Sequence, residues 1–151
     1  MKKVVRKHRR TQEERRGAAL VEAALVLPIM VTMVLGVVEF GRAQMVSQIV
    51  TNAAREGARV AIRDDGSNAT VAQVVQTFMN SSLGVDPNSV GVSVTVTPAA
   101  GNPDPANECG DANIRDLVTV NVTLSFDVVS FVPGHFLSGK DLLGQCAMRH
   151  M

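Results

Sequence analysis

The residue with the most unusual chemistry in this sequence is Glu22, an acidic side chain inside a long apolar run. The run from Gly17 to Val38 contains only this charge and one hydroxyl, that of Thr32. A carboxylate within hydrocarbon costs about 3 kcal/mol on insertion scales unless it finds a partner. Glu22 is therefore either neutralised by a cation from another chain or held near a membrane surface, protonated or reaching toward water.

The other reactive side chains form no recognisable catalytic pattern. The sequence contains no HExxH, P-loop, GxSxG or GxGxxG motif. His135 follows a Pro-Gly turn, distant from any cysteine, and we expect it on the surface. Four acidic residues fit a polar, solvated loop better than a calcium site. They are Asp104, Glu108, Asp111 and Asp116. We therefore expect a protein that is not an enzyme and that holds no metal ion and no cofactor.

Two cysteines, Cys109 and Cys146, are candidates for a covalent crosslink. In an oxidising compartment a disulfide between them would hold a loop against the last strand. It would close a loop of about 38 residues and contribute about 3–4 kcal/mol in the chain-entropy model. Two independent thiols are the alternative interpretation.

Charge is divided unevenly along the chain. The first 16 residues hold eight basic and two acidic side chains, a net charge of +6. The remaining 135 residues hold seven basic and twelve acidic side chains, a net charge of −5. A nucleic-acid-binding domain would carry its positive charge on the folded part, so we expect no nucleic-acid partner. A basic segment before an apolar run favours an N-terminus that stays in the cytoplasm.

The apolar run is long enough to cross a bilayer as a helix, because 22 residues at about 1.5 Å each span roughly 33 Å. Secretory signal peptides have a shorter apolar core, of about 7–15 residues, followed by a small-x-small cleavage site. The late candidate for such a site, Gly41-Arg42-Ala43, contains an arginine. Pro28 lies within the run and is expected to kink the helix.

A single long helix is predicted over about 18–62, because no helix-breaking residue separates the apolar run from the amphipathic segment that follows. Ala53 and Gly57 are small enough to let another backbone approach the helix closely. We expect that backbone to be the protein's own sheet. Three arginines follow one another at i,i+4 on the polar face, namely Arg55, Arg59 and Arg63. They form either a solvated face or a stripe for an acidic partner.

The remaining chain predicts a small α+β head. A helix over about 70–82 begins at a capping box of Thr70 and Gln73 and ends at Gly84. Alternating apolar residues predict strands over 90–96 and 118–128, with a third over 142–148. The segment 98–116 between the first two strands is a long loop. Three antiparallel strands packed on the long helix are the predicted architecture.

The residues around Gly17 resemble a type IV prepilin processing site, in which a basic leader precedes a glycine, four apolar residues and a glutamate. In that family a membrane peptidase cuts after the glycine. The new N-terminus would then be Ala18, and Glu22 would be its fifth residue. The freed α-amino group of one subunit is a cation that Glu22 of a neighbouring helix can neutralise, and only in register.

A wider set of residues resembles the TadE-like family, which comprises minor pseudopilins of bacterial tight-adherence (Flp) pilus systems. The resemblance covers roughly residues 16–62. Its segments are Gly17–Glu22, the apolar run with Pro28, Gly36–Gly41 and Asn52–Arg59. The family often has an aromatic residue after the processing-site glutamate, where this sequence has Ala23. The resemblance implies a pilin-like fold and a structural role in pilus biogenesis or a related secretion apparatus.

The resemblance also implies partners and a location. The partners are a prepilin peptidase, other pilins or pseudopilins, the inner-membrane assembly platform and the lipid bilayer. The expected organisation is a basic leader (1–17), a transmembrane helix (18–40), its extramembrane continuation (41–63) and a head (64–151). The head would lie outside the cytoplasm, anchored in the bacterial inner membrane. The alternative is an uncleaved single-span membrane protein whose head binds a ligand or partner through the 98–116 loop.

Overall fold

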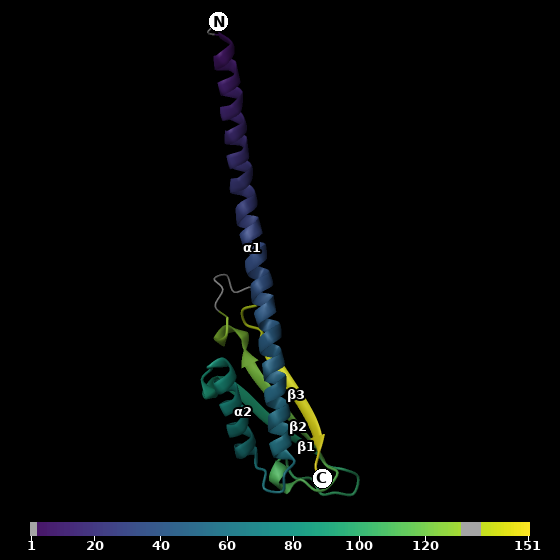
Figure 1. Ribbon diagram of the computed structural model, residues 1–151. Coiled ribbons are helices and arrows are strands. Elements are labelled where there is room, and N and C mark those ends of the chain that lie inside the picture. The colour runs from purple at the N-terminus through teal and green to yellow at the C-terminus, as the bar shows by residue number, and fades with distance from the viewer. Residues whose placement is uncertain (1–2, 131–136) are drawn as a thin grey trace. The chain divides into compact units, whose positions relative to one another are not determined.

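The computed structural model describes residues 3–130 and 137–151, and the chain divides into two compact units, Met1–Val38 and Glu39–Met151 (Figure 1). The long helix α1 contributes to both units. The second unit also contains a second helix, three strands and three short 3-10 turns. The elements are α1 (Lys3–Ala61), α2 (Asn68–Leu83), η1 (Pro87–Ser89), β1 (Val90–Thr97), η2 (Cys109–Asp111), β2 (Leu117–Ser125), η3 (Phe126–Val128) and β3 (Asp141–Arg149).

The first unit is a single stretch of α1 that starts earlier than the sequence predicts. The helix begins at Lys3 instead of near residue 18, so it includes the basic segment. It continues through Pro28, whose carbonyl oxygen accepts a hydrogen bond from the Thr32 hydroxyl at 2.8 Å. Its most apolar window has a mean hydropathy of 2.3 and contains no buried residue. By length and composition, this part of α1 is able to cross a membrane.

The second unit is built around an antiparallel sheet in the order β1-β2-β3. In the register, Val94 faces Val120, and Val120 faces Cys146. The predicted α+β architecture of a long helix on three antiparallel strands is confirmed. One boundary differs, because Phe126 and Val128 belong to η3 instead of extending β2. The buried side chain of Phe126 nevertheless joins the core.

The second half of α1 packs directly against the sheet (Figure 1). Its fully buried side chains are Val46, Val50, Ala53, Ala54, Ala58 and Ala61. A Cβ atom added at Gly144 of β3 would lie 2.6 Å from the backbone carbonyl of Val50. One added at Gly57 would lie 2.7 Å from a methyl group of Val75 in α2. The small residues of α1 and β3 therefore allow close packing inside this unit. The sequence predicts that Gly57 approaches the sheet, but its nearest neighbour is α2, and Val120 of β2 follows at 3.3 Å.

The helix α2 covers the same face of the sheet and is capped at both ends. Ser67 is its N-cap, and its hydroxyl oxygen accepts the Thr70 amide hydrogen at 3.2 Å. The helix therefore starts at Asn68, two residues before the predicted start at Thr70. The N-cap is Ser67 and not Thr70. Gly84 ends the helix with a φ of 68°, a left-handed conformation that favours glycine.

Candidate functional site

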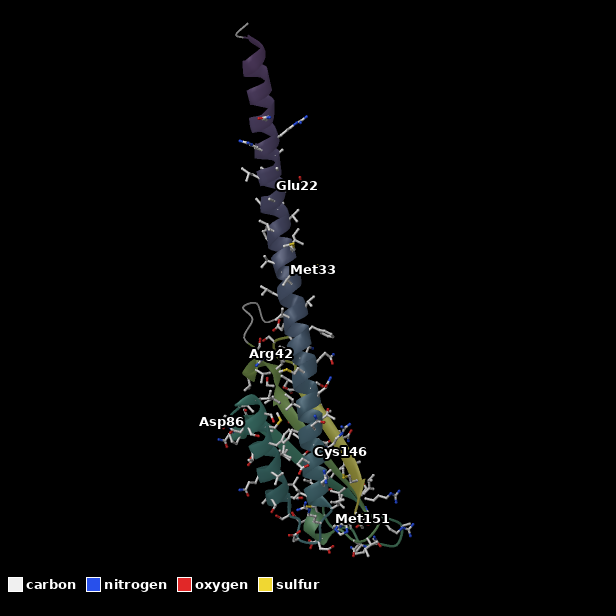
Figure 2. All side chains as sticks on the ribbon, viewed as in Figure 1. Glu22, Met33, Arg42, Asp86, Cys146 and Met151 are labelled. Atoms are coloured by element: carbon white, nitrogen blue, oxygen red, sulfur yellow. The ribbon has the colours of Figure 1, made fainter. Side chains whose placement is uncertain are left out.

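Glu22 lies on the exposed surface of α1 in the first unit (Figure 2). Ala19, Ala23 and Val26 border the shallow depression beside it. Among the described residues, no hydrogen bond or ion pair satisfies its carboxylate. Inserting an ionised carboxylate into hydrocarbon together with its apolar neighbours costs free energy. The first unit therefore presents an exposed acid that has no partner within the described part of this chain.

Gly17 and Ala18 lie five and four residues before Glu22, on the same exposed helix. A Cβ atom added at Gly17 would meet nothing within 4 Å. A glycine within a helix costs about 1 kcal/mol relative to alanine, so it normally needs a packing reason. Packing within the described residues supplies none here. The same holds for Gly36 and Gly41 further along the helix.

A second acidic residue, Glu39, opens the second unit in a different environment. Its side chain is 1% exposed, and one carboxylate oxygen accepts a hydrogen bond from the Ser130 hydroxyl at 3.0 Å. One turn later, the guanidinium Nε of Arg42 donates a hydrogen bond to the Val129 carbonyl. These two contacts fasten the segment after η3 to the first turn of α1 in this unit. Sequence reasoning missed the burial of Glu39, because its contact lies 91 residues away.

The loop 98–116 is organised by the carboxylate of Asp116, which is fully buried. One oxygen accepts hydrogen bonds from the Ala99 amide at 2.8 Å and from the Asn102 side chain at 2.6 Å. The other accepts the Asn113 amide at 2.7 Å. The hydrogen bond from Ala99 is the main reason that the pKa of Asp116 is lowered, and those from Asn102 and Asn113 add to it. The expectation that this carboxylate is solvated is therefore wrong.

A second carboxylate, Glu108, ties the loop to the start of α2. It accepts the Asn68 amide hydrogen at 3.0 Å and the Asn68 side-chain nitrogen at 2.9 Å. The amide of Cys109 donates in turn to the Asn68 side-chain oxygen at 3.3 Å. A carboxylate at a helix N-terminus also interacts favourably with the helix dipole. Within residues 3–130 and 137–151, no cluster of three potential metal-ligating side chains occurs.

The two cysteines are free thiols in the structure, which therefore does not show the disulfide that the sequence suggests. Cys109 is buried in η2, which contacts β1, whereas Cys146 lies on β3. The strand β2 lies between β1 and β3, and each strand spacing is about 4.8 Å. A disulfide needs Cα atoms within about 7 Å. Burial raises the pKa of the Cys109 thiol, and the nearby Glu108 adds to the effect.

The three arginines of the predicted stripe are all exposed, but only Arg55 and Arg59 lie on α1, because the helix ends at Ala61, before Arg63. Arg59 lies 4.0 Å from Glu56, and Arg55 donates to the Asn52 side chain at 3.4 Å. Both contacts are local and solvated, so the arrangement fits a surface face. His135, the other predicted surface residue, lies outside the described residues.

Comparison with known proteins identifies the segment that contains these features. Residues 17–59 match the family model for the TadE-like protein. No curated protein and no solved structure matches the chain. The matched segment begins at Gly17 and includes Glu22, Pro28, Glu39 and two of the three arginines, Arg55 and Arg59. This segment is therefore similar to the TadE-like family, in agreement with the resemblance found in the sequence.

Proposed function

We propose that this protein is a membrane-anchored, pseudopilin-like component of tight-adherence (Flp-type) pilus biogenesis or of a related secretion apparatus. Its role is structural and not catalytic. One observation carries the proposal: the TadE-like segment coincides with an exposed apolar helix whose acid, Glu22, has no partner among the described residues. A subunit that packs its membrane helix beside others supplies both the apolar contacts and the missing cation.

Processing creates that cation. A prepilin peptidase cuts after Gly17, at the cytoplasmic face of the inner membrane, and leaves Ala18 as the new N-terminus. The basic leader keeps this end in the cytoplasm before cleavage and places the head outside it. The α-amino group of Ala18 is charged at neutral pH and lies at the membrane edge. Glu22 of an adjacent subunit neutralises it, and this pairing sets the axial register of the two helices.

The partners follow from this mechanism. The helix contacts the bilayer before assembly and other pilins or pseudopilins afterwards, within the inner-membrane assembly platform. The exposed small residues Ala19 and Ala23, one turn apart, allow a neighbouring helix to approach the region of Glu22. The head carries its own buried core and adds a folded surface outside the cytoplasm.

The substitution Gly17→Leu tests the processing step. No atom lies within 4 Å of a Cβ at Gly17 or at Gly36, so Gly36→Leu is a matched control in the same apolar helix. We expect Gly17→Leu to abolish cleavage in cells that contain the peptidase, and Gly36→Leu to leave it intact. The intact mass of the membrane-extracted protein measures both. A native protein that still begins at Met1 would refute processing and favour the uncleaved single-span alternative.

The substitution Glu22→Ala tests the register. The variant should still be cleaved and inserted, because the Glu22 carboxylate has no partner among the described residues, but it should assemble poorly with other subunits. Glu22→Gln keeps the shape and removes only the charge, so it should show the same defect. Copurification of subunits from membranes, compared at equal protein level, measures assembly. Normal assembly of both variants would contradict the pairing of Glu22 with the α-amino group.

A further inference from the structure

The strand β3 lies at one edge of the sheet, and its outer side has no strand partner among the described residues (Figure 1). Two hydrogen bonds just beyond the ends of the β2–β3 ladder show which backbone groups point outward. The amide of Phe126 donates to the Lys140 carbonyl, and the amide of His150 donates to the Asp116 carbonyl, both at 2.9 Å. Hydrogen-bonded pairs recur at every second residue of an antiparallel ladder, so the even-numbered residues of β3 bond to β2. The amide and carbonyl groups of its odd-numbered residues therefore point to the open side.

The other edge of the sheet, formed by β1, is closed by the protein's own chain. The same alternation gives β1 outward-pointing groups at its even-numbered residues. The first of these, Val90, donates its amide hydrogen to the Pro87 carbonyl, and the last, Val96, donates to the Asn107 side-chain oxygen at 3.1 Å. Covering an edge in this way prevents pairing with another chain. Within the described residues β3 has no such cover, and it contains no proline and no interruption in its register with β2.

The exposed side chains of β3 make this strand complementary to itself. They belong to alternate residues, from Asp141 at one end to Arg149 at the other, with Gln145 midway between the two charges. When two copies of β3 pair antiparallel about Gln145, Asp141 of each copy faces Arg149 of the other. In the same register, Leu143 faces Ala147. This register also pairs odd-numbered residues with odd-numbered residues, which are those with unpaired backbone groups. A shift by two residues would keep the backbone pairing and separate the charges.

The packing of α1 leaves space beside β3 for a second copy. One flank of α1 lies against α2, where Glu56 borders a depression together with Val74. The opposite flank carries the small, half-buried side chains of Ser47 and Thr51, which line a hollow of about 310 Å³. This flank adjoins β3, because the amide nitrogen of Thr51 would lie 2.7 Å from a Cβ atom added at Gly144. Small side chains here allow a second helix to lie close on the same face of a longer sheet.

We propose that β3 pairs antiparallel with β3 of a second copy of this chain, so that two copies of the second unit share one six-stranded sheet. The two-fold axis passes through Gln145, and every contact across the interface occurs twice. The three central residues of each strand exchange about six backbone hydrogen bonds, and two Asp141–Arg149 pairs flank them. The closed edge of β1 stops the sheet from growing further. The inference goes beyond the proposed function, because it uses contacts within the second unit and requires neither cleavage nor a membrane anchor.

Cysteine crosslinking of the full chain in detergent solution tests the pairing. Residues of a hydrogen-bonded antiparallel pair have Cα atoms about 5.5 Å apart, within reach of a disulfide. We therefore expect Gln145→Cys to crosslink to itself on oxidation, in a background that carries Cys146→Ala. Ser93→Cys in the same background is the matched control, since Ser93 is exposed in the same row of the sheet, across Asn121, but lies on β1. Cys109 is fully buried and stays in both proteins. Crosslinking at 145 that is no stronger than at 93 would overturn the proposal.

Mixed crosslinking tests the direction of the pairing. Leu143→Cys and Ala147→Cys, carried on two differently tagged copies, should form a disulfide with each other. In the antiparallel register each residue lies four positions from its own counterpart, about 13 Å along the strand. That distance is too long for a disulfide, so neither variant should crosslink to itself. Self-crosslinking at 143 that is stronger than the mixed product would indicate parallel strands and would overturn the proposal.

Charge reversal tests the complementarity. Asp141→Arg alone places arginines opposite each other at both ends of the interface, and Arg149→Asp alone does the same with aspartates. Each single variant should weaken dimerisation about tenfold, because two attractive pairs become two repulsive pairs. The double variant restores opposite charges and should recover most of the affinity, as measured by sedimentation equilibrium in density-matched detergent. A double variant that is as weak as the single ones would overturn the register. Circular dichroism of each variant shows that the fold is retained.

Discussion

The two compact units of this chain differ in whether their carboxylates have hydrogen-bond partners. In the second unit, Asp116 accepts three hydrogen bonds and Glu39 accepts the hydroxyl of Ser130, all from the same chain. In the first unit, Glu22 has no such partner among the described residues, and its apolar neighbours are exposed. The second unit thus pairs these two carboxylates within its own fold, whereas the proposed function assigns the partner of Glu22 to another subunit. A buried polar group is stable only when it is paired, so the proposal distinguishes the carboxylates that support folding from the one that would support assembly.

The largest expected effect comes from substituting a glycine in each unit, which tests whether only the second unit depends on close internal packing. Gly144→Val would place a Cβ 2.6 Å from the backbone of Val50, and neither backbone can yield easily. We expect a loss of about 3 kcal/mol or more in the stability of the second unit. Gly36→Val in the first unit meets no atom within 4 Å and should leave that stability unchanged. Denaturant unfolding of the purified protein measures both, and equal effects would contradict the division.

The next largest effect concerns the paired acid of the loop, Asp116. Its pKa is lowered in the folded protein, so its contribution to stability is complete above the unfolded pKa of an aspartate. That contribution is lost as the pH falls through the lower folded value. Asp116→Asn should therefore lower the melting temperature at neutral pH and flatten its decline in acid. Asp104→Asn, at an exposed position of the same loop, should change both much less.

The smallest effect is expected at the arginine stripe. Arg55→Gln, Arg59→Gln and Arg63→Gln should each change stability by less than about 0.5 kcal/mol, because these side chains are exposed and their contacts are local. Thermal unfolding measures this change. A larger loss would place these residues among those that hold the second unit together. Unchanged stability with reduced copurification of other subunits would instead assign the stripe to assembly.

The sequence predicted the regular elements well because their signals are local. Period-two alternation gave β1 and β2 near their observed bounds, and the apolar spacing of Val71, Val75 and Met79 matches their burial in α2. The glycine at 84 ended α2 as expected. The two boundary errors, at the start of α2 and at the end of β2, are also local. In each case neighbouring residues are alternative candidates for the same helix cap or the same strand end.

The details that depend on distant contacts could not be predicted in this way. The burial of Glu39 depends on Ser130, and that of Asp116 depends on how the loop returns to Ala99. Cys109 lies in η2, which contacts β1, and Cys146 lies on β3, and these places depend on the strand order. Alternation shows which residues face inward but not which strand lies between them. The candidate site around Gly17 and Glu22 came from motif spacing and resemblance, and the TadE-like match covers that segment.

The contact between Gly144 and Val50 also bears on how the protein is made. The two residues are far apart in the sequence. The strand β3 pairs with β2 and packs on α1, which is synthesised long before it. Contacts of such long range form late in folding. Until β3 has been synthesised, the valine-rich strands β1 and β2 therefore leave one edge of the sheet unpaired, a state prone to aggregation. The last nine-residue strand thus decides when the nascent sheet is protected.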